Sequence, residues 1–375
     1  MIYNLRILCT GIDKMANPIT TTMTEDYTID YGEETFCSQE SVRVFLKTFI
    51  PLTFSFIFLF GLVGNILVVI TFSCYKKRKT MTDIYLLNMA IADILFICTL
   101  PFWAVYYYDQ WIFKDFMCKL VRSIYAINFN CSMLLLACVG IDRYVAIVQA
   151  TRSFRFRTMA LTYKRVLCFS LWMISAVLST ITYIFSECYT TNGNRLACEA
   201  RYPDYLEASK WKLAVLAVEI SAGFLIPFSI MVFCYVSIIK TLLQAKNSQR
   251  HKAINVVVIV VIVFLACQLP YNVILVKKAA KLTDQKPSCQ ERISDSYWLF
   301  LTRTLAYCHC CLNPVIYAFI GVKFRNYFLK IIQDLWCFRK VFLHRTRWSR
   351  ASSDIYSSRK TSEVSVSEGG SSFTV

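Results

Sequence analysis

Seven long apolar runs constrain the fold of this chain more than any other feature. The hydrocarbon core of a bilayer is about 30 Å thick, and a helix needs roughly 20 apolar residues to cross it. Lipid offers the backbone no hydrogen bonds, which favours helices for runs of this length. They occur at about residues 48–74, 83–108, 116–149, 164–186, 209–240, 253–281 and 295–320. We therefore predict an all-α membrane protein, a seven-transmembrane helix bundle.

The positive charge of the chain lies in the connectors between these runs. A net charge of +17 could indicate nucleic-acid binding, but the basic residues form no single face, which argues against that class. Basic connectors follow the first, third, fifth and seventh runs, at 76–79, 152–165, 246–252 and 323–340. Positive connectors face the cytosol, which predicts an extracellular N-terminus in the plasma membrane. The basic segment 277–292 is an exception on the outer side.

Five cysteines lie near or beyond the predicted extracellular ends of the runs: Cys37, Cys118, Cys188, Cys198 and Cys289. Disulfides persist in that oxidising compartment. At least one disulfide is therefore expected, although the spacing leaves its connectivity open.

The segment 1–47 is predicted to be an extracellular acidic tail. It places Tyr27 and Tyr31 among carboxylates in "TEDYTIDYGEETFC", which suits a basic partner. The alternative is a disordered, solvated terminus without a partner.

Two segments are expected after the bundle, which occupies 48–320. Residues 321–337 carry apolar side chains near helical spacing with basic ones between, which predicts an amphipathic helix on the inner membrane surface. Cys337 is a candidate for palmitoylation, with a free thiol as the alternative. Residues 338–375 are serine-rich and are expected to form a disordered cytosolic tail.

A buried carboxylate is expected in the second run. Asp93 needs polar partners, because a charge in a span is costly to insert. Ser132 and Asn313 lie at depths where they could supply them. Their oxygens would suit a Na⁺ ion or a hydrogen-bond network with a protonated carboxyl. A purely structural network is the third interpretation.

The motif "IDRYVAIV" places Asp142, Arg143 and Tyr144 at the inner end of the third run. In one interpretation Arg143 only reaches to lipid phosphate. In the other, the charged end acts in a conformational switch, because Pro270 and Pro314 break the sixth and seventh runs.

The stretch "FLACQLPYN" breaks an apolar run with a polar amide. An unpaired buried amide costs about 1–3 kcal/mol, so Gln268 should face a polar core. Asn128, Asn130, His309 and Asn313 are the expected lining of that core.

Enzymatic and metal functions are not supported by the motifs. The residues of "CHCC", Cys308 to Cys311, would point in nearly all directions from one helix, whereas a zinc site needs converging ligands. The chain has no HExxH motif and too few acids in its runs for a paired-carboxylate protease. We predict a protein without catalytic residues, resident metal or cofactor.

Several motifs resemble those of known receptors. Seven runs, "DRY" at the end of the third and "NPVIY" in the seventh resemble rhodopsin-like G-protein-coupled receptors over almost the whole chain. "TLPFW", "DRYVAIVQA" and "HCCLNPVIYAF" are similar to CC chemokine receptors.

The resemblance implies an extracellular CC chemokine ligand and a heterotrimeric G-protein partner of the inhibitory class, with calcium mobilisation and chemotaxis as outcomes. It also implies receptor kinases and arrestin at the C-terminal tail, and sulfation of Tyr27 and Tyr31. It pairs Cys118 with Cys198 and Cys37 with Cys289, and leaves Cys188 spare.

The same resemblance assigns roles within the bundle. The chemokine end would enter near Trp103, Tyr125 and Glu219. In activation the sixth span would swing about Pro270 and open a cleft beside Arg143. Tyr235 and Tyr317 would then fill the space that the moving helix leaves.

Two positions depart from the family pattern. Arg303 stands where most chemokine receptors have a glutamate that meets a chemokine amine, so Glu219 or Glu199 would have to take that role, or the ligand end is oriented differently. Gln268 stands where most rhodopsin-like receptors have a tryptophan.

Two other functions fit part of the sequence. A secondary transporter would share broken helices and polar groups at the membrane midplane, but no internal repeat relates the two halves of the chain. A chemokine-scavenging receptor would bind ligand without G-protein signalling, and the intact "DRYVAIV" argues against it.

Overall fold

A computed structural model describes residues 37, 40–76, 79–191, 194–202, 208–244, 248–281, 288–320, 325–327, 329–331 and 333–334. The chain divides into two units, Met1–Ser38 and Gln39–Val375. Of the first unit only Cys37 is described, and Tyr27 and Tyr31 lie outside the described residues.

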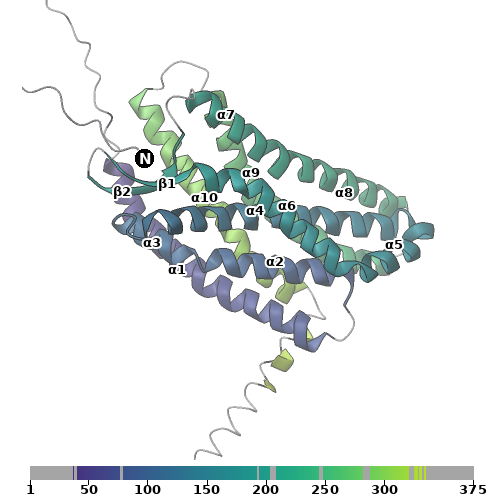
Figure 1. The fold of residues 1–375 in the computed structure, drawn as a ribbon. Coiled ribbons are helices and arrows are strands. Elements are labelled where there is room, and N and C mark those ends of the chain that lie inside the picture. Colours follow the sequence, from purple (N-terminus) through teal and green to yellow (C-terminus); the bar gives the residue numbers. More distant parts are fainter. Residues whose placement is uncertain are drawn as a thin grey trace, which may run out of the picture. The chain divides into compact units, whose positions relative to one another are not determined.

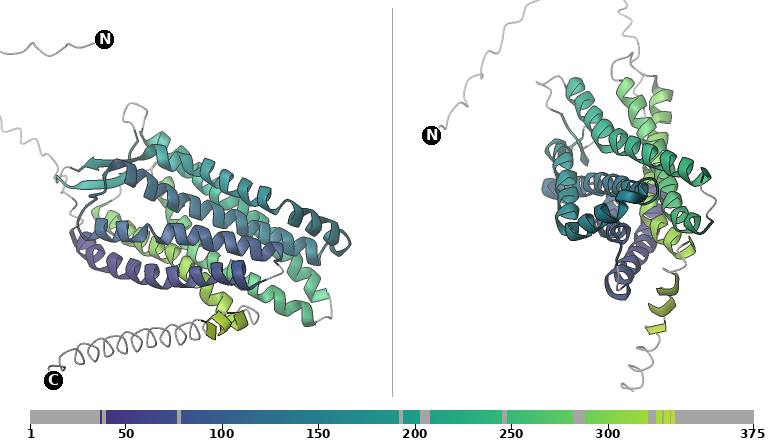
Figure 2. Two further views of the ribbon diagram at one scale, coloured as in Figure 1. Left: turned by 60° about the horizontal axis from the view of Figure 1, so that its bottom comes forward. Right: turned by 90° about the vertical axis from the view of Figure 1, so that its right-hand side faces the viewer.

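The second unit is a bundle of long helices that run alongside one another (Figures 1 and 2). The helices up to the hairpin are α1 (Glu40–Ile70), α2 (Met81–Ile97), α3 (Leu100–Tyr108), α4 (Lys114–Ile147), α5 (Ala150–Thr162) and α6 (Lys164–Phe185). Those after it are α7 (Ala208–Val218), α8 (Ile226–Gln244), α9 (Ser248–Ala280) and α10 (Cys289–Ile320). Helix α1 begins at Glu40, so it takes in the last residues of the segment 1–47 predicted as tail.

Six stretches of the described residues are long and apolar enough to cross a membrane as helices. They are Glu40–Tyr75, Met81–Tyr108, Lys114–Ile147, Lys164–Phe185, Ala208–Thr241 and Val258–Ala280. Helix α10 has 32 residues and packs against α1 and α9, but Arg303, His309 and Asn313 make it more polar. It supplies the seventh helix of the predicted bundle.

Three of the predicted runs are not uninterrupted α-helices. The first ends in a π-helical turn, Thr71–Tyr75. The second is broken at Cys98 and Thr99, because the ring of Pro101 removes a donor and crowds the carbonyl four residues earlier. A π-helical segment, Glu219–Leu225, lies between α7 and α8 and ends two residues before Pro227.

A β-hairpin that the apolar pattern did not predict covers one end of the bundle. Strands β1 (Ser186–Thr190) and β2 (Leu196–Ala200) pair antiparallel. The Cys118–Cys198 disulfide ties β2 to α4, and the Asp115 carboxylate accepts a hydrogen bond from the Cys188 amide at 2.9 Å. We call this the hairpin end, and the opposite end, which carries α5, the α5 end (Figure 1).

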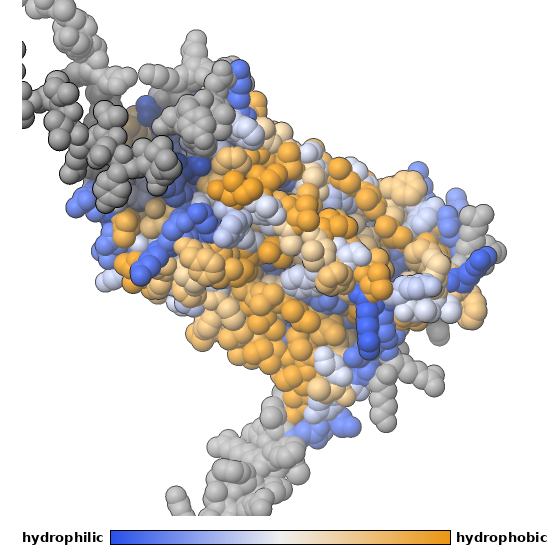
Figure 3. All heavy atoms as spheres, viewed as in Figure 1, coloured by the Kyte–Doolittle hydropathy of each residue, from blue (hydrophilic) through white to orange (hydrophobic). Residues whose placement is uncertain are grey.

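Large apolar side chains are exposed around the bundle. Helix α1 exposes Leu52, Phe56 and Phe60, and α6 exposes Phe169 and Val177. Figure 3 shows apolar residues across the visible face, with hydrophilic ones gathered towards its ends. An apolar surface of this extent indicates contact with lipid.

The predicted amphipathic helix at 321–337 is described only in part. Residues 325–327, 329–331 and 333–334 are helical. The side chain of Ile331 is buried, and Asp334 accepts a hydrogen bond from the Tyr75 hydroxyl at 2.8 Å. The amphipathic helix as a whole stays a prediction, and Cys337 lies outside the described residues.

Candidate functional site

A cavity opens near the hairpin end of the bundle. The four side chains predicted near the end of the chemokine line it together: Trp103, Tyr125, Glu219 and Arg303. An adjoining hollow shares Glu219 and Arg303 and adds two lysines, Lys212 and Lys278. The structure thus brings together these residues from five of the seven predicted runs.

Arg303 projects from α10 into a group of aromatic rings. Its guanidinium carbon lies 5.7 Å from the ring centres of Tyr271 and Phe300, within the range of a cation–π contact. Tyr107, Tyr125 and Tyr307 also surround it. Within the part of the chain that the structure describes, Arg303 makes no ion pair with a carboxylate.

Glu219 is held in the cavity by the π-helical segment that begins with it. The Thr182 hydroxyl of α6 donates to its Oε1 at 3.2 Å. Arg122 lines the same cavity, and its Nε donates to the Ser186 hydroxyl at 2.8 Å. Glu199, the other acid proposed to meet a ligand amine, lies exposed on β2 and does not line the cavity.

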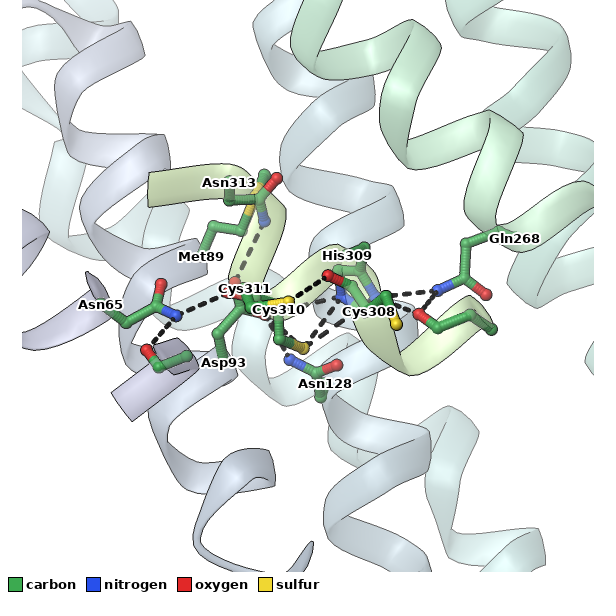
Figure 4. A network of polar contacts seen from close by, with 12 residues as sticks. Asn65, Met89, Asp93, Asn128, Gln268, Cys308, His309, Cys310, Cys311 and Asn313 are labelled. Carbon is green, nitrogen blue, oxygen red and sulfur yellow. Dashed lines mark hydrogen bonds and ion pairs between the residues drawn. The ribbon is translucent and has the colours of Figure 1, made fainter. Parts of the chain in front are cut away.

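A buried polar network surrounds Asp93 in the middle of the bundle (Figure 4). Asn128 of α4 and Asn313 of α10 donate to its two carboxylate oxygens at 2.9 and 3.1 Å. His309 Nε2 lies 3.6 Å from Oδ1 and Cys310 Sγ lies 3.5 Å from it. The network joins α2, α4 and α10.

Ser132, predicted to join Asp93, and Asn130, predicted to line the polar core that Gln268 faces, lie differently in the structure. Ser132 Oγ is buried without a hydrogen-bond partner among the described residues. Asn130 faces α6 instead, where it donates to Ser179 at 3.2 Å.

The two sides of the His309 ring differ in their partners. Nδ1 lies 2.5 Å from the Ala306 carbonyl, which places the proton of the neutral ring on Nδ1 and leaves Nε2 an acceptor. Nε2 then faces a carboxylate oxygen, which is also an acceptor. A proton or a cation between them would relieve that contact, and these are the two occupants, a protonated carboxyl or a Na⁺ ion, expected from the sequence.

Two residues of the "CHCC" motif on α10 lie close to Asp93 of α2. The ligand atoms of Asp93, His309 and Cys310 lie within 4.8 Å of one another. The predicted absence of a resident metal is untested.

Gln268 lies on α9 beside this network (Figure 4). Its Nε2 donates to the Ala306 carbonyl at 3.3 Å and lies 3.2 Å from His309 Nδ1. Its side chain is fully buried, and Pro270 follows two residues later within the same helix. The amide therefore joins α9 to α10 beside the proline break.

Arg143 is held at the α5 end by two side chains. It lies 3.5 Å from the Asp142 carboxylate and donates to the Thr82 hydroxyl, which in turn donates to Asp142 at 3.0 Å. The Tyr144 ring packs instead on Phe233 of α8, with 5.6 Å between ring centres. Arg143 is thus engaged within the bundle.

Two more predicted switch residues, Tyr235 and Tyr317, are buried in the cluster of apolar side chains nearest the α5 end. Pro314 packs against Gly64 of α1. A Cβ atom at Gly64 would lie 2.8 Å from the Pro314 Cβ, so only glycine allows α1 and α10 to approach this closely.

The structure contains the Cys118–Cys198 disulfide that the resemblance implied. Cys118 and Cys198 are bonded, with their Cα atoms 5.6 Å apart. Cys37 and Cys289 are each disulfide-bonded as well, and Cys188 is free.

Sequence reasoning missed several residues of the cavity. Arg122 and Thr182 line it, but each lies in an apolar run without a motif of its own. Tyr271 also lines it, and it lies in the stretch "FLACQLPYN", where only Gln268 and Pro270 were given roles. The sequence shows the aromatic and cationic residues of the seventh run. It does not show which residues of the other helices face them.

Comparison with known proteins places this geometry in a family. The family model described as 7 transmembrane receptor (rhodopsin family) matches residues 64–317. The chain therefore belongs to the rhodopsin family of seven-transmembrane receptors, a class without enzymatic activity. It is accordingly a multi-pass protein of the plasma membrane.

Within that family the chain falls among the C-C chemokine receptors. It is 51% identical to C-C chemokine receptor type 6 of Homo sapiens over 94% of each chain. Its identity to the type 6 receptor of Mus musculus is also 51%, over 94% of this chain and 96% of that one. C-C chemokine receptor type 7 of Homo sapiens is 41% identical over 87% of each.

Proposed function

We propose that this chain is a receptor for an extracellular CC chemokine that activates an inhibitory-class heterotrimeric G protein, with calcium mobilisation and chemotaxis as its outcomes. The observation that carries the proposal is the 51% identity to C-C chemokine receptor type 6 over 94% of the chain. The hairpin end faces outside, so that the cavity with Glu219 and Arg303 receives the end of the chemokine. The α5 end faces the cytosol and receives the G protein.

Helices α9 and α10 connect the two ends in this proposal. Tyr271 and Arg303 line the cavity on these helices, and Gln268 and His309 lie one or two turns further along them. A ligand that displaces the cavity side chains would change the packing of α9 on α10. Pro270, whose missing N–H weakens the helix, is the position at which α9 bends.

Arg143 supplies the output at the α5 end. In the described conformation Asp142 and Thr82 hold its guanidinium. Movement of α9 opens a cleft beside Arg143, where the G protein binds, and Tyr235 and Tyr317 close on the space that α9 leaves. By linkage, a G protein bound at this end tightens chemokine binding at the other.

Several further features complete the proposal. Sulfated Tyr27 and Tyr31 meet basic chemokine surface, where charge-assisted bonds speed association. Asp93 with Asn313 holds a Na⁺ ion or a proton. Receptor kinases and arrestin act on the C-terminal tail, and Cys337 carries a palmitoyl chain.

The direct test is a screen of purified chemokines on cells that express the chain, with calcium flux and G-protein nucleotide exchange as readouts. One or more CC chemokines should activate both. A chemokine that is internalised without nucleotide exchange would instead support a scavenging receptor. The transporter alternative is not retained, because the chain belongs to a receptor family.

A further inference from the structure

We propose that the cavity at the hairpin end binds a carboxylate of the ligand at Arg303, so that the chemokine segment entering the bundle carries an acidic side chain. The proposal deepens the proposed function, on which it rests for the identity of the ligand. The binding of an anion at Arg303 can be tested separately.

The charge of the cavity lining is the first observation. The cavity and its adjoining hollow are lined by four cationic side chains, Arg122, Lys212, Lys278 and Arg303. Glu219 is the one carboxylate among the described residues that line them. A pocket with this excess of one sign concentrates ligands of the opposite charge.

The surroundings of Arg303 are the second observation. Its partners are aromatic faces and the phenol groups of Tyr107 and its neighbours, none of which carries a compensating charge at neutral pH. A guanidinium presents a planar fork of donors that matches a carboxylate. A ligand carboxylate would therefore supply the counter-ion that the chain does not place there.

An unpaired donor in the same lining is the third observation. The indole Nε1 of Trp103 is buried and has no hydrogen-bond partner within the described residues. An indole N–H can only donate, and leaving it unmatched costs about 1–3 kcal/mol. Trp103 lines the cavity together with Arg303, so the unmatched donor lies in the same wall as the guanidinium, and a ligand that supplies acceptors suits this wall.

The position of Glu219 completes the chemical assignment. A ligand amine is repelled by Arg303 but can meet Glu219, which accepts from Thr182 and lies near Arg122. A peptide end with a free amine and an acidic side chain can satisfy both residues. Neither a purely cationic nor an uncharged segment can do so.

A set of matched small probes tests anion binding without knowledge of the chemokine. Thermal unfolding of the purified receptor would be measured with indole-3-acetate, indole-3-acetamide and tryptamine, which share an aromatic body and differ in charge. Only the acetate should raise Tm. The variant Arg303→Gln should weaken acetate binding by about tenfold or more, as expected for a lost charge-assisted bond.

Two further variants control this experiment. Arg292→Gln removes an exposed arginine of the same helix and should leave acetate binding unchanged. Arg303→Lys keeps the charge and should retain part of the acetate binding. It provides the comparison if Arg303→Gln folds poorly. Equal shifts by all three probes, or an acetate shift that survives in a folded Arg303→Gln variant, would overturn the proposal.

The chemokine that the screen identifies provides the second test. Changing an acidic residue in the N-terminal segment of the chemokine to its amide should lower the potency of the chemokine on the wild-type receptor. For one of these residues the change should have no further effect on potency at the Arg303→Gln receptor. Arg303→Glu should abolish activation, which a lysine at that acidic position should restore.

The outcomes separate the two proposals. If no chemokine activates the chain, the proposed function fails while the probe result still stands. If a chemokine activates wild type and Arg303→Gln with equal potency, or has no acidic residue in its N-terminal segment, the function holds and the carboxylate assignment is wrong.

Discussion

The Gln268 side chain of α9 donates a hydrogen bond to the Ala306 carbonyl of α10 at 3.3 Å, two residues before Pro270 breaks the regular bonding of α9. This contact joins a helix that has a natural bending point to the helix that carries Arg303 and His309. It lies between the cavity and the Asp93 network, and it is fully buried. A change in it is therefore expected to alter the equilibrium between receptor conformations.

The substitution Gln268→Leu tests this contact. Loss of the amide removes the bond to α10 and should change basal or agonist-driven nucleotide exchange, measured at equal surface expression. Leu269→Ala, on the lipid-facing side of the same helix, is the matched control because Leu269 is 44% exposed. Unchanged signalling in Gln268→Leu would reduce Gln268 to a packing residue.

The substitution Arg143→Ala tests the output end. It should abolish agonist-driven G-protein activation without preventing chemokine binding. Arg143 is held by Asp142 and Thr82 at the α5 end, whereas the cavity lies near the hairpin end. Arg155→Ala, which removes an exposed arginine of α5, should leave activation intact. If the Arg143→Ala receptor reached the surface and signalled normally, the role assigned to Arg143 would be wrong.

The substitution Gly64→Ala tests the packing of α1 on α10. The added methyl group would lie 2.8 Å from the Pro314 Cβ, so the helices must separate, at a cost of about 1–3 kcal/mol. The Tm of the purified receptor should fall, whereas Val63→Ala, at an exposed position, should change it little. Equal Tm values for the two variants would contradict the close approach.

Cysteine chemistry at the hairpin offers a fourth test. Removing Cys118 or Cys198 should cost about 2–5 kcal/mol and reduce surface expression, whereas Cys188→Ser should not.

Burial and the neighbouring Asp115 carboxylate raise the pKa of the Cys188 thiol. Because a raised pKa lowers the thiolate fraction at a given pH, alkylation of Cys188 should reach half its maximal rate at a higher pH than for an ordinary cysteine. Mass spectrometry of alkylated peptides would measure this rate as a function of pH. A midpoint at a lower pH than for an ordinary cysteine would contradict the prediction.

The helices were largely predictable because membrane insertion requires long apolar runs, and these are visible in sequence. The seventh run was found in the sequence although α10 is more polar than the helices of the other predicted runs. The hairpin β1–β2, the helix α5 and the break at Cys98 were not predicted. Short elements of this kind depend on local hydrogen bonds and on Pro101, and these leave no long periodic signal.

The candidate site was predictable only where a motif or an isolated charge marked a residue. Asp93 and Arg303 stand out because they are charged within apolar runs, and the structure places both among polar or aromatic partners. Arg122 also lies within a run, but it is close to the end of α4, where a charge is common. Ser132 was paired with Asp93 on depth alone, and depth does not fix the direction in which a helix presents a side chain.

The central claim is that the cavity at the hairpin end and Arg143 at the α5 end belong to one coupled switch. The direct measurement is the affinity of the activating chemokine for receptor membranes with and without nucleotide-free G protein. We predict tighter binding with G protein, by a factor of roughly 5–150, and no such change in Arg143→Ala. Equal affinities in wild-type membranes with and without bound G protein would contradict the claim.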